Sequence, residues 1–184
     1  MLAGSIPYPS AGTIAPTVNT YASGSNGVAV DLYYYGSSAG FNDTIQVYDI
    51  TDGYKSGYIL PNHSTTPGTM DIVGAGSINK GDQIVFEIDS PQGIFASDPT
   101  YSADGVNHVY ITSYAGGVVN GTTIPAGLFL GFEDKTKSVS DFDYNDLEIV
   151  TTGVTTSVTP EPSTLALFGT GVFGLVGAAK RRYA

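Results

Sequence analysis

Cysteine is absent from this 184-residue chain, and basic side chains are scarce. Without cysteine there is no disulfide framework, no thiolate metal site and no cysteine nucleophile. The 7 Lys and Arg residues stand against 17 Asp and Glu residues, which gives a net charge of −10 at pH 7. Because binding to phosphates requires clustered basic side chains, this balance argues against nucleic acid as a partner.

The residues that are abundant favour β-structure. The chain has 24 Gly and 13 Tyr residues, and its many Thr, Ser and Val residues are typical of strands joined by tight turns. Its length fits a single domain with appendages. Alternating apolar and polar residues predict eight short strands: 28–35, 44–50, 58–60, 70–73, 83–88, 108–114, 128–132 and 147–151.

Short strands separated by Gly-rich turns predict an all-β fold. We expect an antiparallel two-sheet β-sandwich, jelly-roll-like or immunoglobulin-like, followed by a single apolar helix at the C-terminus. The first residues, MLAGSIPYPSAGT, have neither the basic segment nor the apolar run of a secretory signal. The expected organisation is an extended arm (1–25), the sandwich (26–151), a Thr/Pro linker (152–162) and an apolar segment with a basic end (163–184).

The C-terminal segment reads PEPSTLALFGTGVFGLVGAAKRRYA. Its apolar run, residues 165–179, is followed by Lys180, Arg181 and Arg182. A helix of roughly 15 to 18 residues reaches about 22 to 27 Å, slightly less than a hydrocarbon core of about 30 Å. A basic triplet beside an apolar run tends to stay cytoplasmic, so we expect a membrane anchor with the preceding domain outside. The alternative is a buried core helix.

This tail resembles the PEP-CTERM sorting signal of Gram-negative bacteria. The resemblance rests on Pro160, Glu161 and Pro162, on the Ser-Thr-Leu that follows, and on the Gly-rich apolar run with terminal arginines. It implies recognition by an exosortase-type membrane enzyme, with transient anchoring in the inner membrane. It also implies processing near the Pro-Glu-Pro and release to the cell envelope or the extracellular matrix.

Acidic residues gather between positions 133 and 146, where Lys135 and Lys137 are the basic residues that offset them. Calcium takes six to eight oxygen ligands, and a loop supplies them by placing acids at alternate positions. The spacing therefore predicts a Ca²⁺ site. The alternatives are an acidic turn that hydrogen-bonds its own backbone and a catalytic pair of carboxylates. The candidate ligands are Glu133, Asp134, Asp141, Asp143, Asn145 and Asp146.

The sequences GFED at 131–134 and DFDYND at 141–146 also resemble an uncharacterised domain family common in PEP-CTERM proteins. Its signature is a Gly-Phe-Glu-Asp followed by Asp-x-Asp-Tyr-Asn-Asp, and the resemblance implies the same six residues as signature positions. Two weaker patterns are a polar run from Asp98 to His108 and three consecutive tyrosines at 33–35. We expect Asp98, Asp104, Asn107 and His108 to cap turns, and the alternatives are a second oxygen site or a sugar-binding loop. The tyrosines alternate faces, so we expect one face to pack in the core, and the alternative for the other face is an aromatic platform for sugars or partner chains.

These features predict a non-enzymatic, exported structural protein of the cell surface or extracellular matrix with a calcium-binding acidic loop. The alternative is a calcium-dependent carbohydrate-binding module. The expected partners are an exosortase, the membrane through the C-terminal segment, and either extracellular polysaccharide or other copies of the chain. No serine has recognisable His and acid partners in the sequence, so nucleophilic catalysis has no support.

Overall fold

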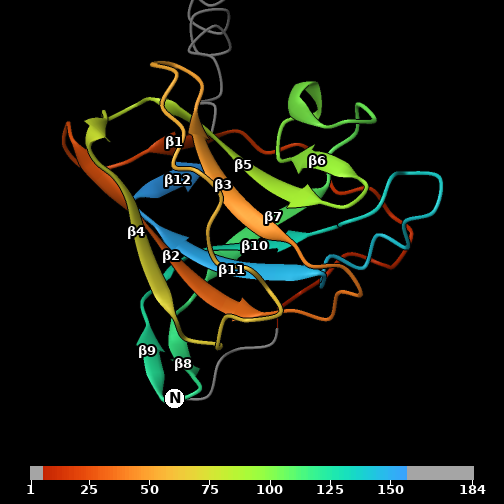
Figure 1. Ribbon diagram of the computed structural model, residues 1–184. Helices are drawn as coiled ribbons and strands as arrows, with labels where there is room; N and C mark the ends of the chain where they lie inside the picture. The colour runs from red at the N-terminus through yellow and green to blue at the C-terminus, as the bar shows by residue number, and fades with distance from the viewer. Residues whose placement is uncertain (1–5, 157–184) are drawn as a thin grey trace, which may run out of the picture.

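Alternating apolar and polar residues form two layers of antiparallel strands (Figure 1). The structure is a computed structural model that describes residues 6–156. One 3-10 turn, η1 (Pro99–Tyr101), interrupts the strands in this part of the chain. The strands are β1 (Thr20–Ala22), β2 (Val28–Gly36), β3 (Thr44–Asp49), β4 (Met70–Ile78), β5 (Gln83–Ser90), β6 (Gly93–Ala96), β7 (Val109–Tyr114), β8 (Gly117–Val119), β9 (Thr122–Ile124), β10 (Gly127–Phe132), β11 (Leu147–Thr152) and β12 (Val154–Thr156).

The first sheet has the order β12-β1-β5-β3, and β6 also pairs with β5. The second sheet has the order β4-β2-β11-β10-β7. The hairpin β8-β9 lies apart from both sheets and projects at the lower end of Figure 1. The expectation of an all-β fold with antiparallel sheets is therefore confirmed.

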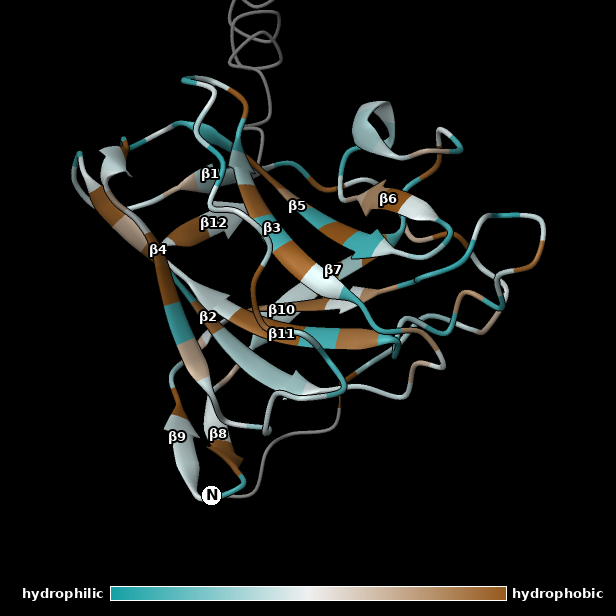
Figure 2. Ribbon diagram, in the orientation of Figure 1, coloured by the Kyte–Doolittle hydropathy of each residue, from teal (hydrophilic) through white to brown (hydrophobic). Residues whose placement is uncertain are grey.

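The main core lies between the two sheets. The first sheet contributes Ile45, Val47 and Phe86, and the second contributes Leu32 and Leu130, all completely buried. In β3 the neighbours of Ile45 and Val47 are more polar, which is visible as alternating colours along this strand in Figure 2. Each such side chain contributes about 1.5 to 3 kcal/mol when it leaves water, so this layer is the principal source of stability.

A second apolar cluster covers the outer face of the second sheet. Tyr34 points into the main core, whereas Tyr33 and Tyr35 pack on the opposite face with Phe129. The N-terminal arm supplies Tyr8, whose ring meets Phe129 edge-on at 5.7 Å between ring centroids. Tyr33 and Tyr35 are therefore part of a packed apolar layer. The N-terminal arm is one of the segments that cover this layer.

Several elements differ from the sequence-based expectation. Residues 58–60 form a single bridge, between Ile59 and Ile45, rather than a strand. The strands β1, β6, β8, β9 and β12 have three or four residues each, too few to show an alternation. Such short strands form because a neighbouring strand supplies their hydrogen-bond partners.

Two expected boundaries also differ. Residues 20–22, expected in the N-terminal arm, form β1, and residues 154–156, expected in the linker, form β12. These strands pair with each other, and Val154 packs in the main core. The predicted apolar helix and the Pro-Glu-Pro lie outside the described residues. Between residues 6 and 156, no helix is long and apolar enough to cross a membrane.

The position of β12 predicts where the chain can be shortened. We expect a chain that ends at Thr159 to keep the β-type circular dichroism and melting temperature of the complete chain. A chain that ends at Thr152 should melt at a lower temperature, because it loses the pairing with β1 and the buried Val154, worth about 1 to 3 kcal/mol. Insolubility or loss of β-structure after truncation at Thr159 would show that the apolar segment belongs to the fold.

Candidate metal centre

Six carboxylates meet where β10 ends and β11 begins, beside the loop that leads into β3. We call this group the acidic corner. The alternation of β10 continues past its last residue, so consecutive side chains face opposite sides of the sheet. Phe132 points into the main core, Glu133 points outward, and Asp134 returns to the core side. The corner consists of Asp43, Glu133, Asp134, Asp141, Asp143 and Asp146.

The outer group of the corner consists of Glu133, Asp141 and Asp143. Each offers a carboxylate oxygen, and these oxygens lie within 4.8 Å of one another. Glu133 is completely buried, and its two oxygens accept hydrogen bonds from the Ser140 hydroxyl and the Tyr144 backbone N–H. Glu133 therefore holds the acidic loop in place, whatever else it binds.

Aromatic side chains alternate with the acids of this loop and anchor it. Phe142 and Tyr144 are buried beneath the loop in a cluster with Ala15, while Asp141 and Asp143 point the other way. Both aromatic residues have positive φ angles, 46° and 60°, which give the loop its tight curl. The Tyr144 hydroxyl accepts the Ala15 N–H at 2.6 Å and so fastens the N-terminal arm to the loop. The alternation in SDFDYND thus has a packing role as well.

The inner group consists of Asp43, Asp134 and Asp146, and it joins the two sheets. Asp43 lies directly before β3 of the first sheet, whereas Asp134 and Asp146 flank β10 and β11 of the second. Asp43 and Asp134 are completely buried, and Asp146 is 5% exposed. The Ser90 hydroxyl, at the end of β5, donates to the Asp134 carbonyl at 2.6 Å. The inner group therefore lies at one end of both layers, where β3 and β11 begin and β10 ends.

Hydrogen bonds satisfy part of the inner group. The Asn62 side-chain amide donates to Asp43 Oδ2 at 3.0 Å, and the Asp134 backbone N–H donates to Asp146 Oδ2 at 3.0 Å. Asp43 Oδ1 and both carboxylate oxygens of Asp134 have no hydrogen-bond partner within the described residues. Buried polar atoms rarely lack a hydrogen-bond partner, because each such atom lowers the free energy of unfolding by about 1 to 3 kcal/mol, and by more when it is charged.

Burial and mutual repulsion raise the pKa values of all three inner carboxyl groups. The pKa of Asp43 rises from 3.8 to about 7, first through burial and then through the charge of Asp146. The pKa values of Asp134 and Asp146 also rise, because burial and the neighbouring carboxylate both disfavour the charged form. Near neutral pH the inner group thus carries negative charge that neighbouring hydrogen bonds and basic side chains balance only in part.

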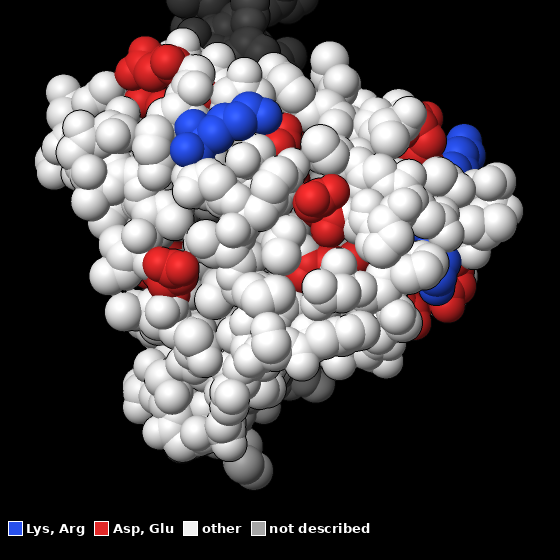
Figure 3. Space-filling model, in the orientation of Figure 1, with Lys and Arg blue, Asp and Glu red and all other residues white. Residues whose placement is uncertain are grey.

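The nearest cation is Lys135. Its ammonium lies 3.9 Å from Asp141 Oδ1, and its charge lowers the pKa values of Asp134 and Asp146. Among the described residues, the pair of Lys135 with Asp141 is thus the one ion pair of the corner. Within residues 6–156, no inner carboxylate forms an ion pair. On the face shown in Figure 3 charged groups are few and dispersed, with no large basic patch.

The structure divides the six residues that the sequence predicted as one site. Glu133, Asp141 and Asp143 form the outer group, and Asp134 and Asp146 belong to the inner one. The Asn145 side chain donates to Asp143 Oδ2 at 2.6 Å and so supports a neighbour. The sequence analysis did not include Asp43, because no local pattern links it to Asp134 and Asp146, which are 91 and 103 positions further along the chain. The folding of both sheets brings the three residues together.

The polar run from Asp98 to His108 caps turns, as expected. Asp98 caps η1 by accepting the Thr100 N–H, and Asp104 accepts the Val106 N–H. His108 is completely buried, stacked on Phe95, with its Nε2 3.0 Å from Asp104 Oδ1. Burial lowers the pKa of His108, which keeps the ring neutral at physiological pH.

Comparison with known families identifies the C-terminal segment. Residues 158–182 match the PEP-CTERM protein-sorting motif. This motif implies an exported protein of a Gram-negative bacterium that is transiently anchored in the membrane and processed by an exosortase. Comparison with curated proteins gave no match.

The raised pKa values predict how pH affects the metal-free protein. Folded Asp43 keeps its proton up to about pH 7, whereas the unfolded chain releases it near pH 3.8. The folded state therefore binds more protons between these values, and this group's contribution to the free energy of unfolding decreases as pH rises.

We expect the melting temperature measured with a chelator to fall from about pH 5 to about pH 7.5, and to fall less in Asp43→Asn. Equal slopes in the two proteins would contradict the assignment of this titration to Asp43. Calcium should bind more tightly over the same rise in pH, because protons and the ion compete for the carboxylates.

Proposed function

We propose that this chain is a non-enzymatic, exported component of the cell surface or extracellular matrix whose folded domain binds calcium at the acidic corner. The observation that carries the proposal is the Asp134 carboxylate, which is completely buried beside Asp43 and Asp146 and has no hydrogen-bond partner for either oxygen among residues 6–156. A divalent cation there would replace repulsion by attraction. The sorting motif supports the exported location.

Calcium fits this set of donors better than other metals do. The available ligands are carboxylate and carbonyl oxygens, which hard cations prefer, and calcium accepts many of them in irregular geometry. Magnesium usually keeps several waters and takes few carboxylates. Zinc prefers His or Cys, but His108 is engaged by Asp104 and His63 is exposed beside the Ala39 carbonyl.

Calcium at the inner group would hold the two sheets together. Asp43 belongs to the edge of the first sheet and Asp134 to the second, so shared coordination links the layers at one end. The outer group would extend the site toward solvent through Asp141, whose side chain is 64% exposed. This arrangement suits a protein outside the cell, where stability cannot depend on chaperones.

A structural role also agrees with the surroundings of the corner. A surface hollow of about 470 Å³ beside it is lined by Asp104, Thr136, Lys137 and Ser138, and so contains one carboxylate rather than a facing pair. Tyr33 and Tyr35, the alternative sugar platform, pack into the outer apolar cluster. Both observations favour a structural component over a glycosidase or a tyrosine-based carbohydrate site.

Calcium titration of the complete chain tests the corner. We expect Asp134→Asn to remove one bound calcium ion per chain in calorimetry and to raise the melting temperature of the metal-free protein, because a repulsive buried charge is gone. Calcium at about a hundred times its dissociation constant should add about 2.7 kcal/mol to the wild-type free energy of unfolding at this site.

Asp89→Asn is the matched control, since Asp89 is exposed on the nearby strand β5 and should leave binding unchanged. The double variant Asp141→Asn/Asp143→Asn should weaken binding less than Asp134→Asn does, because the outer oxygens are closer to solvent. Full calcium stoichiometry and affinity in Asp134→Asn would refute the proposed site.

The sorting motif predicts processing at the Pro-Glu-Pro. A chain carrying an added secretory signal, expressed in a host with an exosortase, should lose the segment after Glu161 and yield a product of lower mass. Replacing Pro160, Glu161 and Pro162 with alanine should prevent this, and a host without exosortase should retain the full segment. Equal masses ending at Ala184 in all three samples would exclude processing, and the tail would be a plain anchor.

A further inference from the structure

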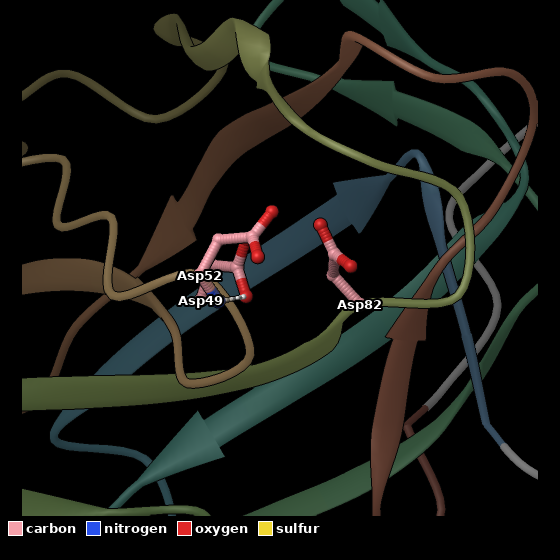
Figure 4. Close-up of side chains that lie close together, drawn as sticks. All are labelled: Asp49, Asp52 and Asp82. Atoms are coloured by element: carbon pink, nitrogen blue, oxygen red, sulfur yellow. Dashed lines mark hydrogen bonds between the residues drawn. The ribbon is translucent and has the colours of Figure 1, made fainter.

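A second group of carboxylates lies at the opposite end of β3 from the acidic corner. Asp49 is the last residue of β3, Asp52 follows in the next turn, and Asp82 lies directly before β5 (Figure 4). In Figure 4, Asp49 and Asp52 face Asp82 from a different segment of the chain. Six residues of strand span about 20 Å, so this group is separate from the corner.

The three carboxylates are close enough to share one ion. Each offers an oxygen, and these oxygens lie within 4.8 Å of one another. Calcium binds oxygen at about 2.3 to 2.6 Å, so ligands on opposite sides of the ion are about 4.6 to 5.2 Å apart, and neighbouring ligands are closer. The spacing therefore suits calcium with little movement of the side chains.

A hydrogen-bonded turn accounts for part of this arrangement but not for all of it. Asp49 Oδ1 accepts the N–H groups of Thr51 and Asp52 at 2.9 and 3.2 Å. Asp82 Oδ2 accepts the Asn79 N–H at 2.6 Å, and Asp52 Oδ2 accepts the Asn79 side chain at 3.0 Å. In the part of the chain that the structure describes, Asp49 Oδ2 has no hydrogen-bond partner, although Asp49 is completely buried.

The negative charge of these three carboxylates is also not balanced by basic side chains among the described residues. Burial, followed by the neighbouring charge of Asp82, raises the pKa of Asp49 despite the two backbone hydrogen bonds. None of the three carboxylates takes part in an ion pair within residues 6–156. A buried carboxylate next to another carboxylate is stabilised either by a proton or by a cation.

We propose that Asp49, Asp52 and Asp82 form a second calcium site, independent of the acidic corner. Asp49 supplies a buried oxygen from the end of β3, Asp82 supplies one from the turn directly before β5, and the exposed Asp52 closes the site on the solvent side. Water completes the coordination. Asp52, being exposed, also gives the ion a route in from solvent.

The ion would fasten a turn on which three strands depend. Asp82 belongs to the turn between β4 and β5, which crosses from the second sheet to the first. Its carbonyl accepts the Ala22 N–H at 2.8 Å, and the Gly81 N–H donates to the Ala22 carbonyl at 2.9 Å, so the same turn holds β1. Calcium between Asp82 and Asp49 would add β3 to this junction.

The test is calcium calorimetry on the complete chain, kept in solution with a mild non-ionic detergent. We expect Asp82→Asn to lose one bound calcium ion per chain relative to wild type, and Asp52→Asn to keep that ion with about tenfold weaker affinity, since an exposed ligand contributes less. Asp89→Asn, an exposed change of the same charge, should match wild type. Circular dichroism checks that each variant is folded.

Failure here is distinguishable from failure of the acidic corner. If Asp134→Asn loses an ion and Asp82→Asn loses none, the corner stands and the second site is refuted. If Asp82→Asn loses an ion and Asp134→Asn loses none, the second site stands alone. An Asp82→Asn protein that does not fold is replaced by Asp49→Asn. If that variant retains every bound ion, the proposal is overturned.

Discussion

The burial of the Asp134 carboxylate is the constraint on which the acidic corner depends. Removing a carboxylate from water is costly unless hydrogen bonds or a counter-ion replace the lost hydration, and neither oxygen of Asp134 has a hydrogen-bond partner in the described part of the chain. Asp43 and Asp146 increase that cost through their own charge. Protonation of the carboxyl group or binding of a cation lowers this cost. Calcium would lower it at neutral pH while the carboxylates stay ionised. The proposal of a metal site follows from this energetic imbalance.

The same β-alternation that places Asp134 inside also organises the rest of the molecule. Along β10 and the residues after it, one set of side chains fills the space between the sheets and the other faces the N-terminal arm. Tyr8, Ala15 and Tyr144 connect this arm to the acidic loop through ring contacts and the hydrogen bond from Ala15. The outer face of the second sheet is therefore covered around Phe129 and Val150, and the loop carrying Asp141 and Asp143 is held from beneath by aromatic side chains. The packing of these aromatic side chains therefore fixes the backbone that carries Asp141 and Asp143.

The two proposed sites lie at opposite ends of β3, and each joins segments that are distant in sequence. Hydrophobic burial accounts for the middle of the two layers, where Val47 and Phe86 are completely buried. At the two ends of β3 the chain forms turns with few apolar contacts. There, carboxylates from neighbouring segments lie next to one another. Calcium at both ends would make the stability of an exported domain depend on the ion concentration outside the cell. The sorting motif at residues 158–182 gives this domain its route to that environment.

The sequence by itself determined the all-β class, the positions of seven longer strands, the sorting motif and the concentration of acids near residue 140. These features depend on local composition and on side-chain alternation, which are readable along the chain. Only the tertiary structure decided that β1 and β12 pair, that Glu133 and Asp134 belong to different groups, and that Asp43 and Asp82 each complete a cluster. Pairing of three-residue strands depends on a partner elsewhere in the chain. Likewise, a carboxylate becomes a candidate ligand through burial next to others, and that burial exists only once the sheets have packed together.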